Sequence, residues 1–402
     1  MNISELVKKN CCGCSACVNS CPKKCIAMKP DSEGFWYPVT DENLCIDCKK
    51  CERVCPVLNG HKADNQPKAY LVRNRNAALR KSSSSGGFFP AAAEFVIEQG
   101  GCVFGAGYDE KFNVRHSFIE SMDDITKFNR SKYVQSFIGN TYKQTKDFLE
   151  NGRTVLFTGT PCQIEGLLTF LGKNYDNLYT MDIICKGVPS PKFWRKYLKW
   201  HIKRSKKEIK EVRFREKTYG YGSTTMRVVY ADGSEYDEPY DVDPMLQFYS
   251  KEMISRPSCY NCRFKGKHRR SSFTAGDYWY VSGAAPEMDD NIGVTQILVN
   301  NDKAAAAFEQ IRKRLDVAEL DFDHDSAING GMMVSSAQPN PRREEMFADL
   351  ATMSMYGLQR KYFPGTFRLK NRIKRQLRPI MYRFGILKVY KKRMRKKQSE
   401  NG

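Results

Sequence analysis

Two cysteine runs near the start of the chain repeat one spacing, and that spacing is typical of iron–sulfur ligation. The runs are Cys11-x2-Cys14-x2-Cys17-x3-Cys21-Pro and Cys45-x2-Cys48-x2-Cys51-x3-Cys55-Pro. In two-cluster ferredoxins the fourth cysteine, just before the proline, ligates the other cluster. The spacing therefore predicts two [4Fe–4S] clusters with these ligands: Cys11, Cys14, Cys17 and Cys55 for the first, and Cys45, Cys48, Cys51 and Cys21 for the second.

Zinc sites and disulfides are the alternatives for these cysteines. Zinc ligands usually come as two residues, a long gap and two more, often with histidine, which differs from the pattern here. Cysteines clustered at ligand spacing favour a reducing cytoplasm over a disulfide-forming compartment. Cys12 and Cys25 fall outside the spacing, and we expect Cys12 to be a spectator and Cys25 to pack as a small apolar side chain.

Four later cysteines form a second group. Cys162 lies at a strand-to-helix turn, Cys185 ends the next expected strand, and Cys259 and Cys262 form a C-x2-C pair. Neighbouring parallel strands end at the same edge of a sheet, where ligands usually bind, so Cys162 and Cys185 can meet there. Four thiolates at one point would suit a third cluster or a structural zinc ion. A reactive thiol at Cys162 with a separate redox pair is the remaining alternative.

A serine-rich turn provides a candidate phosphate site. Residues 81–87 read Lys-Ser-Ser-Ser-Ser-Gly-Gly and run into an alanine-rich helix. Backbone N–H groups at a helix start attract phosphate, although a plain serine-rich helix cap explains the same residues. Because clusters carry single electrons, an enzyme that contains them normally needs a two-electron partner such as a flavin.

The elements that must position these residues indicate two folded parts. We expect an α+β ferredoxin-like domain of the two-cluster type at residues 1–60, a linker at 61–68, an α/β domain at 69–340 and a basic extension at 341–402. The expected strands are 68–73, 102–106, 114–119, 154–158, 178–184, 211–215, 226–230 and 294–299. The expected helices are 90–98, 142–150, 161–171, 191–203 and 303–315.

Composition and charge narrow the possible functions. The chain has 402 residues, 41% of them hydrophobic, and a net charge of +21. Residues 366–402 hold 14 Lys or Arg and one acid, which leaves a net charge of +8 for the rest of the chain.

Since basic and aromatic residues are not interleaved on an evident face, we expect no nucleic-acid partner. The start lacks an apolar signal region, and no apolar run approaches the ~20 residues of a membrane span.

The basic end of the chain resembles a membrane-surface helix. Apolar residues recur among Lys and Arg over residues 367–390, interrupted by Pro379, and residues 391–397 add a polybasic patch. Such segments lie on anionic membranes, whereas a solvated basic tail is the alternative. We therefore expect a cytoplasmic protein that can sit peripherally on the inner face of the membrane.

Several motifs in one order resemble the beta subunit of coenzyme F420 hydrogenase/dehydrogenase, fused to an N-terminal ferredoxin domain. They are the doubled cysteine run, the Ser-Ser-Gly-Gly turn, Ser131-Lys-Tyr-Val-Gln-Ser136, Gly159-Thr-Pro-Cys-Gln163, Cys185-x-Gly-Val-Pro-Ser190, Cys259-x2-Cys262 and Gly276-Asp-Tyr-Trp279. The resemblance implies FAD, a deazaflavin donor and a third [4Fe–4S] cluster at Cys162, Cys185, Cys259 and Cys262. It also implies an FAD site at these residues: Ser84, Ser85, Gly86, Gly87, Lys132, Tyr133, Gln135, Thr158, Gly159 and Thr160.

Two positions depart from the motifs of this family. Lys186 stands where relatives often have histidine, and Tyr280 where they have glycine. Bacterial proteins with this layout resemble members of surface-polysaccharide gene clusters, so the electron donor stays open between a deazaflavin and another carrier. Two functions follow: an FAD- and iron–sulfur-dependent oxidoreductase, or a relay subunit without its own substrate that serves a redox partner protein. No acid–base pair stands out as catalytic.

Overall fold

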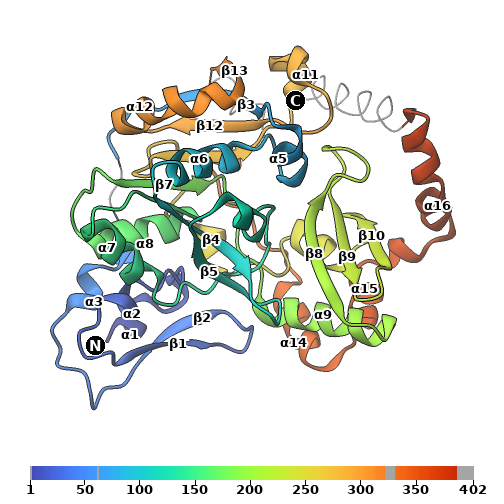
Figure 1. The fold of residues 1–402 in the computed structure, drawn as a ribbon. Helices are drawn as coiled ribbons and strands as arrows, with labels where there is room; N and C mark the ends of the chain where they lie inside the picture. The colour runs from blue at the N-terminus through green and yellow to red at the C-terminus, as the bar shows by residue number, and fades with distance from the viewer. Residues whose placement is uncertain (1, 61–62, 322–330, 387–402) are drawn as a thin grey trace.

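The computed structural model describes residues 2–60, 63–321 and 331–386. Figure 1 shows three parts: a small N-terminal unit below, a large sheet with helices on both faces, and a small antiparallel sheet beside it.

Two short helices begin where the two cysteine runs turn in the N-terminal unit. Helices α2 and α3 follow Ser15 (φ 64°) and Lys49 (φ 58°), which are the equivalent residues of the two runs. Cysteines supply much of its small core, together with a few aliphatic residues such as Ile3 and Val7. The elements are α1 (Ile3–Val7), α2 (Ala16–Ser20), β1 (Ile26–Pro30), β2 (Trp36–Thr40), α3 (Lys50–Arg53) and α4 (Pro56–Asn59).

An eight-stranded mixed sheet forms the centre of the molecule, in the order β13-β3-β12-β11-β7-β6-β4-β5. The neighbours β11, β7, β6 and β4 are parallel, and the remaining pairs are antiparallel. The carboxyl ends of the four parallel strands therefore lie at one edge. The strands are β3 (Lys68–Asn74), β4 (Cys102–Tyr108), β5 (Val114–Ile119), β6 (Val155–Gly159), β7 (Leu178–Ile183), β11 (Phe273–Asp277), β12 (Thr295–Val299) and β13 (Leu315–Leu320).

Helices cover both faces of this sheet (Figure 1). Val103 and Leu156 pack in the core with α6 and α12, whereas Phe104 and Phe157 pack with α7 and α8 on the other face. This alternation follows from the two-residue period of a strand. The helices are α5 (Ala77–Ser82), α6 (Phe88–Ile97), α7 (Thr141–Glu150), α8 (Pro161–Leu171), α11 (Val281–Ala284) and α12 (Asp302–Ile311).

The smaller sheet, of order β10-β9-β8, is antiparallel and has its own aromatic core. Trp194, Phe214 and Phe248 lie at its centre. Helix α16, at the right of Figure 1, lies at the outer side of this sheet. The elements are β8 (Ile209–Glu216), β9 (Thr225–Tyr230), β10 (Glu235–Pro239), α9 (Pro191–Ser205), α10 (Pro244–Ser250), α14 (Arg343–Thr352), α15 (Met355–Tyr362) and α16 (Leu369–Arg383).

The regular elements expected from sequence are present, and α8 has the predicted bounds. Strands β1, β2, β10, β11 and β13 lie outside the strands expected from sequence. The structure also differs from the expected basic extension at 341–402, because Met346, Leu350 and Leu358 of α14 and α15 are buried in the core of the smaller sheet. The exposed basic segment therefore begins only at α16, and residues 387–402, with the polybasic patch, lie outside the described part. Within the described residues, the helices are too short or too polar to cross a membrane.

Candidate functional site

Three groups of cysteines lie around small hollows in the structure. The first hollow is lined by Cys11, Cys14, Cys17 and Cys55, which are the residues that the spacing assigns to one cluster, together with Cys12. Burial, together with repulsion from Cys11, raises the pKa of the Cys17 thiol far above its usual value. Because four buried thiolates repel one another, this donor set suits a positively charged metal core.

The second hollow is lined by Cys21, Cys45, Cys48 and Cys51, again the set that the spacing assigns together. Cys25 also borders it, buried, with its Sγ 3.3 Å from the Cys21 Sγ. Against the raising effect of burial, hydrogen bonds from Cys25 and from nearby backbone N–H groups lower the pKa of Cys21. Cys25 thus contacts a proposed ligand, in addition to packing as expected.

The third hollow brings together Cys162, Cys185, Cys259 and Cys262. Cys162 is in the first turn of α8, after β6, and Cys185 follows the parallel strand β7, so the sheet edge brings the two together. Cys259 lies in the 3-10 helix Pro257–Asn261. Burial raises the pKa of Cys185, and so do the neighbouring thiols of Cys259 and Cys162. This group has the same donor chemistry as the first.

Cys12 also lines the third hollow, although the cysteine spacing predicts no role for it. Hydrogen bonding to the Cys14 thiol raises the pKa of Cys12, and hydrogen bonding to the Cys162 thiol opposes this rise. Cys12 therefore lies between a thiol of the first group and a thiol of the third. Only the packing of the N-terminal unit against α8 reveals this position.

A cavity of about 490 Å³ opens at the carboxyl ends of the parallel strands. Eight of the ten residues predicted for the FAD site line it: Ser84, Ser85, Gly87, Lys132, Tyr133, Thr158, Gly159 and Thr160. Asp277, at the end of β11, and Cys185, after β7, also line it. The cavity thus occupies the sheet edge where ligands bind in α/β proteins.

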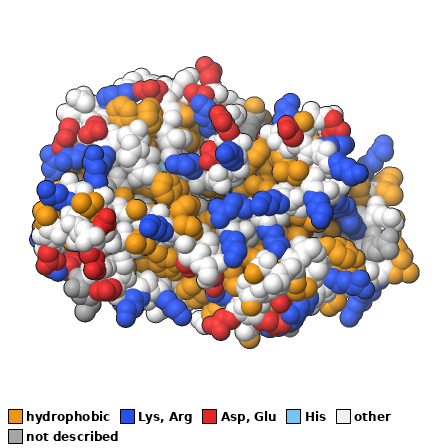
Figure 2. Space-filling view, turned by 90° about the horizontal axis from the view of Figure 1, so that it is seen from below, with side chains coloured by type: hydrophobic (Ala, Val, Ile, Leu, Met, Phe, Trp, Pro, Cys, Tyr) orange, Lys and Arg blue, Asp and Glu red, His pale blue; other side chains and the backbone are white. Residues whose placement is uncertain are grey.

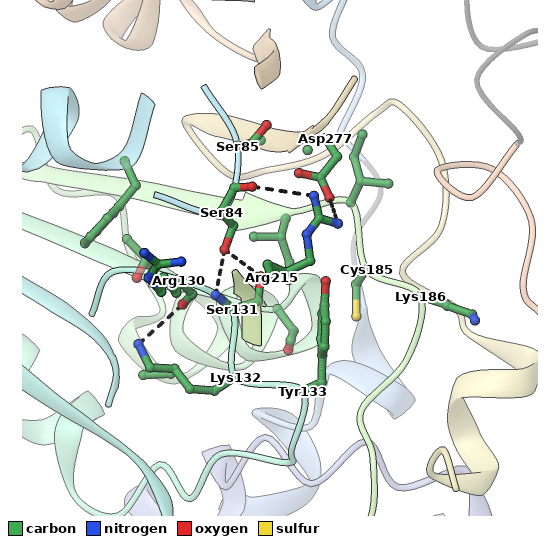
Figure 3. A pocket seen from close by; sticks show the side chains of 18 of the residues that line it. Ser84, Ser85, Arg130, Ser131, Lys132, Tyr133, Cys185, Lys186, Arg215 and Asp277 are labelled. Atoms are coloured by element: carbon green, nitrogen blue, oxygen red, sulfur yellow. Dashed lines mark hydrogen bonds and ion pairs between the residues drawn. The ribbon is translucent and has the colours of Figure 1, made fainter. Parts of the chain in front are cut away.

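The serine turn leads to the start of α6 at one side of this cavity. Gly87, with φ 87°, is the residue before α6, and no side chain of the described residues caps the first turn. The Ser84 Oγ accepts a hydrogen bond of 2.7 Å from the Ser131 N–H, which joins the turn to the segment that holds Lys132 (Figure 3). Free N–H groups at the start of a ten-residue helix suit phosphate.

Basic side chains surround the same turn. Arg215 forms an ion pair of 2.7 Å with Asp277 (Figure 3). Lys132 donates to the carbonyl oxygens of Asn129, Arg130 and Lys127. Burial, aided by the charge of Arg130, lowers the pKa of Lys132 to about 7, and burial lowers the pKa of Lys217 to about 7. Lys132 lines the cavity, and Lys217 donates to the Ser85 oxygen of the serine turn, so an anion bound at this turn would favour the charged form of both lysines.

Two of the predicted FAD residues do not line the cavity. Gly86 packs against the sheet, and a Cβ there would lie 2.3 Å from the Val72 oxygen. The Gln135 side chain accepts a hydrogen bond of 3.1 Å from the Trp36 N–H, so it contacts the N-terminal unit instead. The sequence motif could not distinguish these roles, because the N-terminal unit reaches Gln135 only in the folded chain.

The two residues that depart from the family motif occupy different places. Lys186 forms an ion pair with Glu252, lies over the Tyr249 ring and points away from the other labelled side chains in Figure 3. Tyr280 lies elsewhere: it packs against the cluster of buried residues that contains Leu71, Tyr278 and Leu298.

His116 borders the cavity. Its ring nitrogens contact the Ser136 hydroxyl and the Thr158 oxygen. Burial lowers the pKa of His116 to about 4, against the raising effect of the bond to Thr158. His116 therefore fits a neutral structural histidine.

These features define an iron–sulfur protein with a two-cluster ferredoxin-type unit and an α/β domain. Two family models match the chain. The first is "4Fe-4S dicluster domain", over residues 10–59, and the second is the carboxyl-terminal part of "Coenzyme F420 hydrogenase/dehydrogenase, beta subunit", over residues 152–323. The chain thus combines an N-terminal dicluster domain with a region, residues 152–323, that matches the family of coenzyme F420 hydrogenase/dehydrogenase beta subunits.

Individual relatives match separate parts. A subunit of the F(420)H(2) dehydrogenase of Methanosarcina mazei is 21% identical over 174 residues, which cover 40% of this chain and 49% of that protein, about half of its length. "Ferredoxin 7Fe" of Hydrogenibacillus schlegelii is 38% identical over 65 residues, which cover 15% of this chain and 77% of the ferredoxin. A chain of the F420-reducing [NiFe] hydrogenase complex from Methanosarcina barkeri aligns at 14% identity with a TM-score of 0.44, over 77% of this chain and 94% of that chain.

Proposed function

We propose that this chain is an FAD-dependent oxidoreductase that transfers electrons between a two-electron carrier and single-electron acceptors. The cavity would hold FAD, with its phosphates at the serine turn and the start of α6. The three thiol groups would hold three [4Fe–4S] clusters. Bound FAD would supply two-electron chemistry, and the clusters one-electron transfer.

The observation that carries this proposal is that the cavity and the three thiol groups adjoin one after another. The cavity and the third hollow share Cys185 and the three residues after it. The third and first hollows share Cys12 and Val57, and the first and second share Ile3. A continuous row of sites from a cofactor cavity to the protein surface is what an electron carrier requires.

The spread of the thiols favours clusters over single zinc ions. All ligands of a zinc ion lie ~2.0–2.3 Å from it, so they converge tightly. Within the described ranges, no group of three Cys, His, Asp or Glu side chains is arranged so that it could hold a single metal ion. Sulfur ligands of a cubane bind different iron atoms and can lie further apart.

Anaerobic reconstitution tests the metal content. We expect about 12 Fe per chain, with matching sulfide, from three cubanes. Cys259→Ser should lower this to about 8 and leave the ferredoxin-type signals in place. Zinc in the anaerobically purified protein, or unchanged iron in Cys259→Ser, would contradict the third cluster.

Titration with FAD tests the cavity. We expect saturable binding that quenches flavin fluorescence, and at least roughly tenfold weaker binding in Lys132→Met, because a cation beside the phosphates is lost. Lys199→Met, which changes an exposed lysine of α9 outside the cavity, should bind as the wild type. If the wild type, Lys132→Met and Lys199→Met bind FAD with equal affinity, the proposal that this cavity binds the FAD phosphates is wrong.

A relay subunit that serves a partner enzyme is the second candidate function. Cys45 and Cys48 are exposed, and Leu44 and Ile46 beside them are 56% and 57% exposed, so the second thiol group lies at an open surface. The M. mazei relative is, by its name, a subunit of a dehydrogenase. An assay of purified protein with artificial acceptors and candidate donors distinguishes the oxidoreductase from the relay subunit. A relay subunit shows no turnover in this assay without its partner.

We also propose that α16 holds the chain on an anionic membrane surface. Exposed apolar residues recur along it every three or four positions and so share one face: Leu369, Ile373, Leu377, Ile380 and Phe384. The helix contains six basic residues and no acid. Arg378 pairs with Asp241 at 2.8 Å and Arg375 with Glu238, so another face binds the body and leaves the apolar face free.

The right edge of Figure 2, where α16 lies in Figure 1, shows hydrophobic and basic side chains together. Such a surface suits headgroups and acyl chains. It would place the protein beside lipid-linked intermediates of polysaccharide assembly.

Vesicle flotation tests this role of α16. Full-length protein should float with anionic but not neutral vesicles at low salt. The variant Ile373→Gln/Ile380→Gln should not float with these vesicles. The control Tyr356→Gln, which changes another exposed apolar residue, should float like the wild type. Equal flotation of all three proteins would exclude this role.

A further inference from the structure

Among the residues that the structure describes, Arg256 is a buried cation without a carboxylate partner. Its side chain is 0% exposed, the lowest value among the five buried arginines that the structure describes. The other four pair with acids: Arg80 with Asp290, Arg215 with Asp277, Arg269 with Asp182 and Arg343 with Glu33. A charge taken out of water is costly unless an opposite charge compensates it.

All hydrogen-bond partners of Arg256 in the described chain are neutral. Its Nε donates to the Cys11 oxygen at 2.8 Å, and its Nη1 donates to the Trp36 oxygen at 3.0 Å and to Gln135 Oε1 at 3.3 Å. The Tyr37 ring lies 4.0 Å from the guanidinium carbon. Nη2 is buried and has no hydrogen-bond partner among the described residues. These contacts orient the guanidinium but do not neutralise it.

The position of Arg256 indicates where its counter-charge lies. Its backbone holds Cys259 of the third group, because the Cys259 N–H donates to the Arg256 oxygen at 3.0 Å. Its side chain reaches Cys11 of the first group. The charge of Arg256 also acts on the thiols of Cys162 and Cys259. The guanidinium thus lies between two groups of thiols, each of which becomes negative when it ligates iron.

We propose that Arg256 is the shared counter-charge of the first and third clusters and raises the reduction potential of both. This rests on the proposed function, because it requires a cluster at each thiol group. A cation beside a cluster stabilises the reduced form more than the oxidised form, since reduction adds a negative charge. The second group does not contact Arg256 and provides an internal reference.

Redox titration of anaerobically reconstituted full-length protein, followed by electron paramagnetic resonance, tests the proposal. Iron content is measured first, and Cys259→Ser identifies the signal of the third cluster. In Arg256→Met, the ratio of reduced to oxidised cluster at a fixed potential should fall at least tenfold for the first and third clusters. For a one-electron couple this is a shift of about 59 mV. The ratio for the second cluster should stay within twofold.

Two further variants separate charge from packing. Arg256→Lys retains the cation and should stay closer to the wild type than Arg256→Met. Arg343→Met removes another buried arginine at the same interface, one that already has Glu33, and should leave all three ratios within twofold. If Arg256→Met does not fold, Arg256→Gln, which is polar but neutral, replaces it.

The possible failures are distinguishable. Wild-type protein with only two clusters would refute the proposed third cluster before any potential is compared. Three clusters with unchanged potentials in Arg256→Met would refute the role of Arg256 alone. An equal shift at all three clusters would also refute it, because it would indicate general loosening of the ferredoxin unit.

Discussion

At the scale of single residues, the structure separates cysteines that look alike in sequence. Cys48 and Cys25 both border the second hollow, but only Cys48 belongs to the repeated spacing. We expect Cys48→Ser to disrupt the second cluster, and Cys25→Ser to keep the iron content, because Cys25 acts through a hydrogen bond to Cys21. Iron and sulfide assays measure this difference. Equal iron loss in both variants would make Cys25 a ligand.

Two half-buried lysines give a prediction on pH: Lys132, which lines the cavity, and Lys217, which donates to the Ser85 oxygen of the serine turn. The pKa values of Lys132 and Lys217 are lowered to about 7, so both are charged below pH 7 and lose their protons as the pH rises through 7. Because FAD phosphates favour the charged lysines, binding should weaken between about pH 6 and pH 8. In Lys132→Met this decline should be smaller, since only Lys217 still titrates. Fluorescence titration at both pH values measures it, and a pH-independent affinity in the wild type would contradict it.

At the scale of elements, α8 joins the sites. Its first turn holds Cys162, and Gly166 one turn later faces the first thiol group, where a Cβ would lie 2.8 Å from the Cys14 Cβ and 2.9 Å from its Sγ. Gly166 therefore allows the ferredoxin unit to approach the α/β domain. We expect Gly166→Ala to lower the iron content by up to one cluster and to lower the melting temperature by a few degrees, which corresponds to about 1–3 kcal/mol.

A matched control exists for this substitution. A Cβ added at Gly365 would meet no atom of the described residues within 4 Å, and the backbone there has no positive φ, so Gly365→Ala should retain full iron content. If Gly166→Ala also retains its iron and stability, the close approach of α8 to Cys14 is not required for cluster binding.

At the scale of the whole molecule, the N-terminal unit depends on its ligands more than the body does. Its core consists largely of cysteines, with few aliphatic residues, whereas the large sheet is packed on both faces. Metal binding therefore supplies much of its folding free energy. After iron removal, limited proteolysis should cut first between residues 10 and 68, while the body stays intact. Cleavage first within the large sheet would contradict this order.

The sequence by itself determined the features that depend on local spacing. The cysteine runs, the β6–α8 turn and the amphipathic pattern of α16 follow from residues close together in the chain. The sequence also predicted the meeting of Cys162 and Cys185, because parallel strands end at one sheet edge. Strand β13 was missed: its partner β3 lies more than 200 residues away, and no local pattern encodes that pairing.

Only the tertiary structure decided which residues lie between the two parts. Docking of the ferredoxin unit on α8 places Cys12 beside Cys162, brings Gln135 to Trp36 and buries Arg256 against Cys11. None of these contacts joins residues near in sequence. Burial then changes their chemistry, because a cation that water would solvate in an open loop requires a counter-charge inside the protein. The linear order of the motifs identifies the family, and the packing of its two parts determines how their sites adjoin.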